Sequence, residues 1–384
     1  MLEKIHIKNI CSIGEAEMDF TKGNYQYLED NILENVVNPI AIYGHNGSGK
    51  TSFFRAIAEF VNMMIAPIEN LNPFEINYLN IKELSPSNLK KNENKLESSI
   101  DFKFTIKNST YFYSITTSLK YGITKEVLKK DNTTIFEREQ TKYVFNSNEY
   151  KLSTNSKLIL VLRTLASNEI NDDVIQSVYK FLCSFTCIDL LLINKGGFVT
   201  SKLFSSSTNI YDLLVEKSDE VKETLKKFDD FPVYSIVKDK NDFRIAAPFY
   251  NYTIVIEDKD NFTGVLPFGL ISAGMRNTSI LLSMLYYVPE ESVIFIDELE
   301  TALHPSTIKS LLEVVKKKKI QLVFSSHNTN ILTYLRPDQI YFAKWNKGYS
   351  KLLRLSSIYP NIREVNNIEK MYLNHTLDES INEK

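Results

Sequence analysis

Residues 44–51 read Gly44-His45-Asn46-Gly47-Ser48-Gly49-Lys50-Thr51, and this stretch decides the fold of the chain. Gly44 and Gly49 are separated by four residues and followed by lysine and threonine, which is the phosphate-loop pattern. Glycines permit the left-handed turns with which backbone N–H groups surround phosphates, and the following helix points its positive end at them. We therefore predict that all eight residues contact a nucleotide, that Lys50 neutralises its β and γ phosphates, and that the Thr51 hydroxyl coordinates Mg²⁺.

The sequence around the loop supplies the strand and the helix that this pattern requires. Residues 38–43 form a short apolar run that ends at Gly44 and is typical of a buried strand. After the loop, apolar residues recur at helical spacing until Pro67, namely Phe53, Ile57, Phe60, Val61 and Met64. An ordinary glycine-rich turn before a helix is the alternative, but the order of strand, loop and helix favours phosphate binding.

A second pattern, apolar residues followed by two carboxylates, stands at residues 293–298. Val293-Ile294-Phe295-Ile296 predicts a buried parallel strand, which would deliver Asp297 and Glu298 to the carboxyl edge of the sheet, where ligands of open α/β sheets bind. There we expect Asp297 to hold Mg²⁺ and Glu298 to orient and deprotonate the attacking water. Such patterns are common at strand ends, so this one gains its weight from the phosphate loop.

Asp297 follows Lys50 by 247 residues, which is too far for a compact nucleotide-binding core without a long insertion. Two short segments flank the acidic strand. Leu270-Ile271-Ser272-Ala273-Gly274-Met275-Arg276 places Ser272 25 residues before Asp297, and Ser325-Ser326-His327 places its histidine 30 residues after it. The apolar stretch 322–324 before His327 favours a role at the site over a purely structural histidine.

With these segments, the chain resembles the ABC-type ATPases that are not transporters, namely the SMC, RecF and OLD-like group often described as AAA-family ATPases. Residues 44–51 match the Walker A motif, Ser272-Ala273-Gly274 the Ser-x-Gly core of the signature motif, and residues 293–298 Walker B. His327 matches the switch histidine, and residues 300–305 look like the segment after Walker B. Residues 5–10 look like the group's first strand, although Ile10 stands where an aromatic residue is common.

Residues 335–342 resemble a narrower set of proteins. This segment, Leu335-Arg336-Pro337-Asp338-Gln339-Ile340-Tyr341-Phe342, looks like the one after the switch histidine in a bacterial subset linked to antiphage abortive-infection systems. Met275-Arg276 depart from the pattern, because transport ATPases usually have glutamine there and many members of the subset have threonine directly after the glycine.

The resemblance implies a fold and a mode of action. The fold is α/β, a P-loop NTPase of ABC-ATPase (SMC/RecF head) type, with an antiparallel β-meander and a helical insertion. The implied ligands are ATP and Mg²⁺, and the implied active form is a homodimer that closes around two ATP molecules. In it, Ser272 and Gly274 of one chain contact the γ-phosphate held by the other chain, and a helix start suits such an anion. Hydrolysis, with Glu298, Lys50 and His327 as catalytic residues, would then release the dimer.

We divide the chain into three parts: 1–150 with Walker A and the β-meander, 151–232 as the helical insertion, and 233–384 with the signature, Walker B and switch histidine. Strict alternation predicts the meander from about residue 100 to about residue 150. Polar segments without periodicity predict loops at 82–99, 194–197 and 205–209. Gln140 and Glu126 are two candidates for a Q-loop residue, although each fits an exposed hairpin position better.

Composition limits the classes of function. The chain has 384 residues, with 45 basic and 47 acidic side chains and a net charge of −2, so no global basic field indicates a nucleic-acid binder. The run Lys316 to Lys319 fits a solvated helix end better than a nucleic-acid patch. Three cysteines, and no apolar run near the roughly 18 residues of a membrane span, predict a cytoplasmic protein with no membrane partner. Cys183 and Cys187 fit buried thiols better than a metal pair.

Our first functional hypothesis is an ATPase that senses or scaffolds in phage defence and controls a separate effector protein, a nuclease or a toxin. Only 57 residues follow His327, which is too few for the nuclease domain that OLD proteins carry there. The alternatives are a RecF-like DNA-repair clamp and a nucleotide-binding scaffold with little turnover. DNA-stimulated ATPase activity with steep salt dependence would favour the clamp, and ATP binding without turnover would favour the scaffold.

Overall fold

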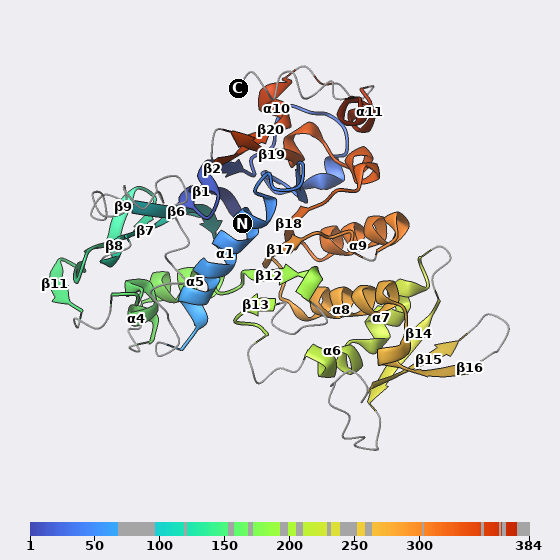
Figure 1. The fold of residues 1–384 in the computed structure, drawn as a ribbon. Helices are drawn as coiled ribbons and strands as arrows, with labels where there is room; N and C mark the ends of the chain where they lie inside the picture. The colour runs from blue at the N-terminus through green and yellow to red at the C-terminus, as the bar shows by residue number, and fades with distance from the viewer. Residues whose placement is uncertain are drawn as a thin grey trace, which may run out of the picture.

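A fifteen-stranded mixed sheet organises the computed structural model (Figure 1). The strand order is β11-β10-β9-β8-β7-β6-β1-β2-β20-β19-β5-β18-β17-β12-β13. The structure describes residues 1–67, 97–118, 121–152, 157–167, 172–192, 199–204, 210–228, 232–238, 252–257, 263–301, 303–346, 349–360, 362 and 366–374. The expected loops at 194–197 and 205–209, and residues 82–96 of the expected loop 82–99, lie outside these ranges, whereas residues 97–99 belong to strand β6.

The central strands of the sheet are parallel and largely buried. They are β5 (Ile40–Tyr43), β12 (Thr186–Asp189), β17 (Val293–Asp297), β18 (Gln321–Ser325) and β19 (Ile340–Asn346), and every pairing among them is parallel. This arrangement explains why residues 293–296 are continuously apolar, since helices cover both faces of such a sheet.

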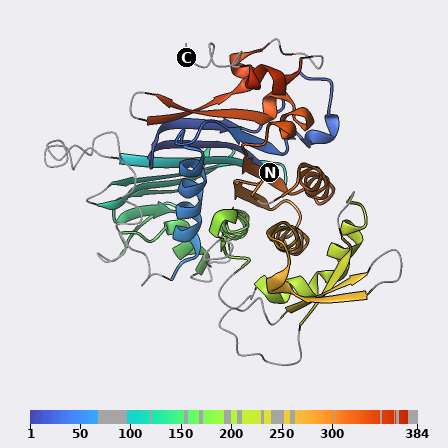
Figure 2. The ribbon, with the colours of Figure 1, turned by 45° about the vertical axis from the view of Figure 1, so that its right-hand side comes forward.

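Alternate residues of β17 pack against helices on opposite faces of the sheet. Val293 and Phe295 belong to the core that includes α1 (Lys50–Ile65), while Ile294 and Ile296 belong to the core that includes α8 (Ala273–Tyr287) and α9 (Pro305–Lys317). Figure 2 shows α1 on one side of the central strands and α8 and α9 on the other. The carboxyl ends of β5, β17 and β18 are therefore held between two packed helical layers.

The rest of the large sheet is mainly antiparallel. It contains β1 (Leu2–Ile10), β2 (Ile13–Asp19), β20 (Tyr349–Arg354) and a meander of β6 (Glu97–Ile106), β7 (Ser109–Ser118), β8 (Gly122–Lys130), β9 (Thr133–Glu139), β10 (Lys142–Phe145) and β11 (Asn148–Lys151). Each strand of the meander pairs antiparallel with the next. The predicted α/β architecture with an antiparallel β-meander is confirmed.

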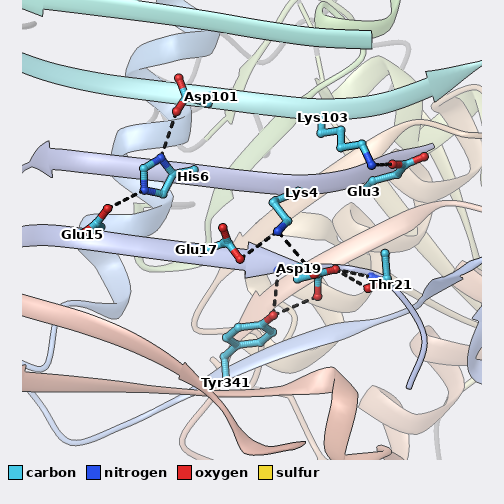
Figure 3. A network of polar contacts seen from close by, with 10 residues as sticks. All are labelled: Glu3, Lys4, His6, Glu15, Glu17, Asp19, Thr21, Asp101, Lys103 and Tyr341. Carbon is cyan, nitrogen blue, oxygen red and sulfur yellow. Dashed lines mark hydrogen bonds and ion pairs between the residues drawn. The ribbon is translucent and has the colours of Figure 1, made fainter. Parts of the chain in front are cut away.

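One face of β1, β2 and β6 carries a polar network, drawn in Figure 3. His6 lies between two carboxylates, with Nδ1 3.0 Å from Asp101 Oδ2 and Nε2 3.0 Å from Glu15 Oε1. The hydrogen bond to Asp101 raises the pKa of His6, although partial burial opposes this shift. Lys4 pairs with Glu17 at 2.9 Å on the same face.

A buried ion pair fastens the meander to α4 (Val161–Ser167). The Glu126 carboxylate accepts hydrogen bonds from the backbone N–H groups of Val161 at 2.7 Å and Leu162 at 2.9 Å, and from the Tyr113 hydroxyl at 2.8 Å. The Arg138 guanidinium lies 3.7 Å from the same carboxylate, and both side chains are inaccessible to solvent. Our expectation that Glu126 occupies an exposed hairpin position is therefore wrong.

Residues 335–342 also form a buried clamp. Arg336 Nη2 lies 2.9 Å from Asp338 Oδ2, both side chains are fully buried, and Asp338 also accepts the N–H of Gly23 at 2.7 Å. The Tyr341 hydroxyl donates to the Asp19 carbonyl at 2.9 Å and accepts the Asp19 N–H at 2.8 Å. These bonds tie the start of β19, and the turn before it, to the end of β2 and to the chain that follows it.

Segment 151–232 is not purely helical, which corrects our description of it as a helical insertion. Its helices are α4, α5 (Asp173–Leu182), α6 (Ile210–Glu216) and α7 (Ser218–Leu225). Between α5 and α6, the strands β12 and β13 (Val199–Ser201) join the large sheet, and β12 pairs parallel with β17. Cys183 and Cys187, at this junction, are buried as predicted.

A smaller unit follows, at the lower right of Figure 1. It is an antiparallel sheet of β14 (Tyr234–Lys238), β15 (Tyr252–Glu257) and β16 (Thr263–Pro267), packed on α6 and α7. The remaining elements are short: β3 (Ile32–Leu33), β4 (Val36–Val37), α10 (Leu355–Ile358), α11 (Ile368–Leu373), and the 3-10 turns η1 (Glu29–Asn31), η4 (Leu190–Leu192), η6 (Phe268–Leu270), η7 (Thr329–Tyr334) and η8 (Pro337–Gln339). Among the described residues, no helix is long and apolar enough to cross a membrane.

Candidate nucleotide-hydrolysis site

The phosphate loop lies where β5 ends and α1 begins. Three of its glycines have positive φ angles: 149° at Gly44, 78° at Gly47 and 103° at Gly49. A Cβ atom on Gly44 would lie 2.4 Å from the carbonyl oxygen of Ala343, and one on Gly49 would lie 2.2 Å from Ser350 Oγ. Both positions therefore require glycine for backbone conformation and for space. His45, Asn46 and Gly47 are exposed at the apex of the loop.

Lys50 folds back along this loop. Its Nζ donates to the carbonyls of Gly44 at 2.8 Å and His45 at 3.3 Å. Burial lowers the pKa of Lys50, while the nearby carboxylates of Asp297, Glu298 and Glu300 raise it. The ammonium group thus stands between the loop and the acids, where a phosphate chain would receive its charge.

Two hydroxyl groups of the loop fit an oxygen-rich ligand. Thr51 is exposed in the first turn of α1, so its hydroxyl is accessible. Ser48 Oγ is buried and has no hydrogen-bond partner in the part of the chain that the structure describes. A buried hydroxyl without a partner is costly, and a phosphate oxygen above the loop would satisfy it.

Asp297 and Glu298 stand at the carboxyl end of β17, as the sequence predicts. The side chain of Asp297 is buried and accepts a hydrogen bond from the Ser325 hydroxyl of the neighbouring strand β18. Ser325 Oγ also accepts the backbone N–H of Glu298 at 2.7 Å. Glu298 has a φ angle of 53°, which is uncommon outside glycine and marks the sharp exit from the strand.

Glu298 has the electrostatic surroundings of a proton acceptor. Desolvation raises its pKa above the usual 4.5, and the carboxylates of Asp297 and Glu300 raise it further, while His327 and Lys50 lower it. A carboxylate with a raised pKa is a stronger base than a free one, which suits proton transfer from water near neutral pH. The residues that alter this pKa come from three separate segments, so these segments meet at Glu298.

His327 follows β18 and has an exposed side chain. Its backbone N–H donates to the Glu300 carboxylate, which connects the segment after β18 to the segment after β17. The Tyr43 hydroxyl, at the end of β5, donates to the carbonyl of Asn328 at 2.9 Å. The predicted switch histidine is therefore held at the same sheet edge as the phosphate loop and the acids.

Ser272 caps the N-terminus of α8, as expected for a signature motif at a helix start. Its hydroxyl accepts the N–H of Met275 at 3.2 Å, and the residue is exposed. Gly274 lies in the first turn of the same helix. Asn277 Nδ2 donates to the carbonyl of Thr301 at 3.1 Å and ties this helix to the segment after Walker B, of which residue 302 lies outside the described ranges.

Asp189 is a site residue that the sequence did not predict. It ends β12 and pairs in register with Asp297 of β17, so two carboxylates stand side by side at the sheet edge. Burial raises the pKa of Asp189, and the charge of Asp297 adds to this effect. The sequence does contain a signal for Asp189, because Cys187-Ile188-Asp189 repeats the pattern of apolar residues followed by an acid. The helical spacing of the apolar residues before Cys187 suggested a helix instead of a strand.

Neither Q-loop candidate lies at this site. Gln140 is exposed, has a φ angle of 51° and stands at the turn between β9 and β10, as expected for a hairpin residue. Glu126 is buried between the meander and α4. The strand β12 ends beside Walker B, on the side of β17 away from β18, which makes Asp189 the stronger candidate for that position.

Comparison with solved structures shows which fold the chain has. The Smc head bound to the C-terminal winged-helix domain of ScpA matches with a TM-score of 0.51 at 14% sequence identity, covering 92% of this chain and 97% of that one. The SMC head domain from Thermotoga maritima matches with a TM-score of 0.47 at 13% identity, covering 92% and 98%. A Smc head with an extended coiled coil, bound to the C-terminal domain of ScpA derived from Pyrococcus furiosus, gives 0.44 at 12%, covering 92% and 95%.

The chain thus has the P-loop NTPase fold of SMC heads, as the resemblance in its motifs implied. The family model described as "AAA domain, putative AbiEii toxin, Type IV TA system" matches residues 40–333. The chain belongs to this family of AAA-type ATPases. No protein with a curated description matches it.

Proposed function

We propose that this chain is a Mg²⁺-dependent ATPase that binds ATP in the phosphate loop and hydrolyses it with Glu298 as general base. The observation that carries this proposal is the position of Glu298. It follows a buried strand, its pKa responds to Lys50 of the phosphate loop and to His327, and its backbone is fixed by Ser325.

The residues divide the chemistry among them. Backbone N–H groups of 44–49 and the ammonium of Lys50 bind and orient the phosphates. Thr51 and Asp297 would hold Mg²⁺ through their side-chain oxygens, the ligand type that this ion prefers, and the ion would offset the negative charge of the phosphates. Glu298 accepts the proton of the attacking water, and His327 approaches the γ-phosphate from the segment after β18.

We further propose that the active form is a homodimer closed around ATP. Ser272 and Gly274 stand at an exposed helix start, where backbone N–H groups and the helix dipole suit a phosphate from a second copy. The dimer would then close when the γ-phosphate is present and open when the γ-phosphate is lost.

Light scattering tests the dimer. Glu298→Gln should retain ATP. Its measured mass should be that of a dimer with ATP and that of a monomer with ADP. Ser272→Arg in the same background places a bulky cation in the dimer contact and should stay monomeric while still binding ATP. A Glu298→Gln chain that remains monomeric with ATP bound would contradict nucleotide-gated dimerisation and leave the single-chain site intact.

We also propose a role in phage defence, in which the ATPase senses or scaffolds and controls a separate effector, a toxin or a nuclease. The family description, which names a type IV toxin–antitoxin system, supports this proposal, as does the segment 335–342. Three buried free thiols fit the reducing cytoplasm. Co-expression with the product of the adjacent open reading frame should give a complex of fixed stoichiometry. This complex should be stable with one of the two nucleotides, ATP or ADP, and dissociate when that nucleotide is replaced by the other. Two proteins that purify separately with either nucleotide would contradict control by direct contact.

A further inference from the structure

A pocket of about 610 Å³ opens beside the phosphate loop. One wall is formed by residues 44–48 of the loop, and the other by residues 342–345 of β19 together with Tyr372 of α11. This volume lies within the range of about 300–1,000 Å³ that small-molecule sites occupy. A single ligand in it would touch the phosphate loop and β19 at once.

The strand β19 is held against the phosphate loop by main-chain geometry. It pairs parallel with β5, with Phe342 opposite Tyr43, and so runs beside the strand that feeds the loop. Ala343 presents its carbonyl 2.4 Å from where a Cβ of Gly44 would be, so the loop and the strand are in close contact at this point. The wall opposite the loop is thus a fixed part of the sheet.

Trp345 is the large aromatic residue that this wall leaves accessible. Its exposed fraction is 49%, whereas Phe342 in the same wall is 2% exposed. Phe342 stacks on Tyr372 with ring centroids 5.5 Å apart and an interplanar angle of 13°, and Tyr372 itself is partly buried. Trp345 pairs across the β19–β20 hairpin with Ser350, the residue whose hydroxyl lies against Gly49.

These observations place an exposed indole on the wall of a pocket whose other wall binds phosphates under the proposed function. A nucleotide has an aromatic base joined to its phosphates by a sugar, and stacking on an aromatic side chain is the common way to hold a base without reading its edge. We propose that Trp345 is the platform on which the base of the bound nucleotide stacks. Stacking alone accepts any base, so this platform adds affinity for nucleoside triphosphates over inorganic polyphosphate.

Tryptophan fluorescence tests this inference directly, because Trp345 is the only tryptophan in the 384 residues. Titration of the full-length protein with ATP should change the emission of Trp345 saturably, with a midpoint that matches ATP binding measured by equilibrium dialysis. Inorganic tripolyphosphate should compete with ATP in dialysis and leave the emission almost unchanged, because it fills the loop and has no base.

Variants give a second readout. Trp345→Ala should weaken ATP binding about 5- to 100-fold, the effect of losing one stacked base, and leave tripolyphosphate binding unchanged. Trp345→Phe should keep most of the affinity. Tyr150→Ala removes another exposed aromatic ring, on the distant strand β11, and serves as the matched control that binds ATP like the parent.

The outcomes separate this inference from the function on which it rests. Dialysis that detects ATP binding, together with unchanged Trp345 emission and full affinity of Trp345→Ala, overturns the base platform and leaves the ATPase proposal standing. No ATP binding by the parent overturns both. Equal losses of ATP and tripolyphosphate affinity in Trp345→Ala would mean that the ring only supports the loop, which also overturns the platform.

Discussion

Replacing Glu126 should destabilise the chain more than replacing any exposed carboxylate of the meander. Glu126→Ala leaves three donors without their acceptor, namely the N–H groups of Val161 and Leu162 and the hydroxyl of Tyr113. It also removes the buried countercharge of Arg138, whose hydrogen bonds to the backbone carbonyls of Gln140 and Ile159 remain. Removing one partner of a buried pair costs about 3–5 kcal/mol.

The matched control is Glu137→Ala on β9. Glu137 pairs with Lys125 at 2.9 Å, but both side chains are about half exposed, at 44% and 50%. An exposed pair contributes about 0–1 kcal/mol. The cost of Glu126→Gln should fall between these two, at about 1–3 kcal/mol. The amide keeps one acceptor oxygen, but its NH₂ group is a donor and would face a backbone N–H that is also a donor.

Urea denaturation followed by circular dichroism measures these differences. With an m-value of about 3 kcal/mol/M or more for a chain of this size, Glu126→Ala should lower the midpoint by roughly 1 M. Equal midpoints for Glu126→Ala and Glu137→Ala would refute the reasoning. So would a Glu126→Gln protein with parental stability and no ATP turnover, because that is the behaviour of a Q-loop residue.

Three further predictions concern the clamp, the polar network and the base. Asp338→Asn leaves Arg336 buried without its countercharge and should lower the free energy of unfolding by about 3–5 kcal/mol in the same urea assay. The control Asp212→Asn, in an exposed pair with Lys238, should lower it by under about 1 kcal/mol. The pKa of His6 is raised, so its stabilisation is present below the usual 6.5 and lost as pH rises through the folded value. His6→Gln should therefore lower the free energy of unfolding in the urea assay by under about 1 kcal/mol at low pH and match the parent at high pH. The raised pKa of Glu298 in the free enzyme should place the acidic limb of the kcat/KM–pH profile above 4.5, with activity lost as pH falls through that limb, and a limb at or below 4.5 would contradict its role as base.

The local patterns of the sequence predict the central strands β5, β17 and β18, because each pattern is short and contained within one element. The strand at 293–296 is continuously apolar and ends in acids, and the structure places its residues between two helical layers. Gly44 and Gly49 are required because both have positive φ angles and because neighbouring atoms leave no room for a Cβ. Any chain with this loop must meet the same two conditions. These features follow from a few neighbouring residues, so no long-range information is needed to find them.

Features that depend on distant partners are the ones that the sequence does not reveal. Glu126 looks like any polar residue of a hairpin, and only Arg138 from the next strand and the N–H groups of α4 make it a buried anion. Asp189 gains its place from pairing with Asp297, more than a hundred residues later in the chain. Trp345 is similarly a single exposed ring until β19 is placed beside the phosphate loop.

Phosphate release by the Glu298→Gln protein is the most direct test of the central claim that Glu298, the residue after β17, is the catalytic base. The substitution keeps the size of the side chain and leaves the hydrogen bond between its backbone N–H and Ser325 Oγ in place. Compared with the parent at equal ATP occupancy, determined by dialysis in the presence of Mg²⁺, we predict a loss of about 100- to 10,000-fold in turnover. ATP binding that stays intact while hydrolysis continues at the parental rate would contradict the account.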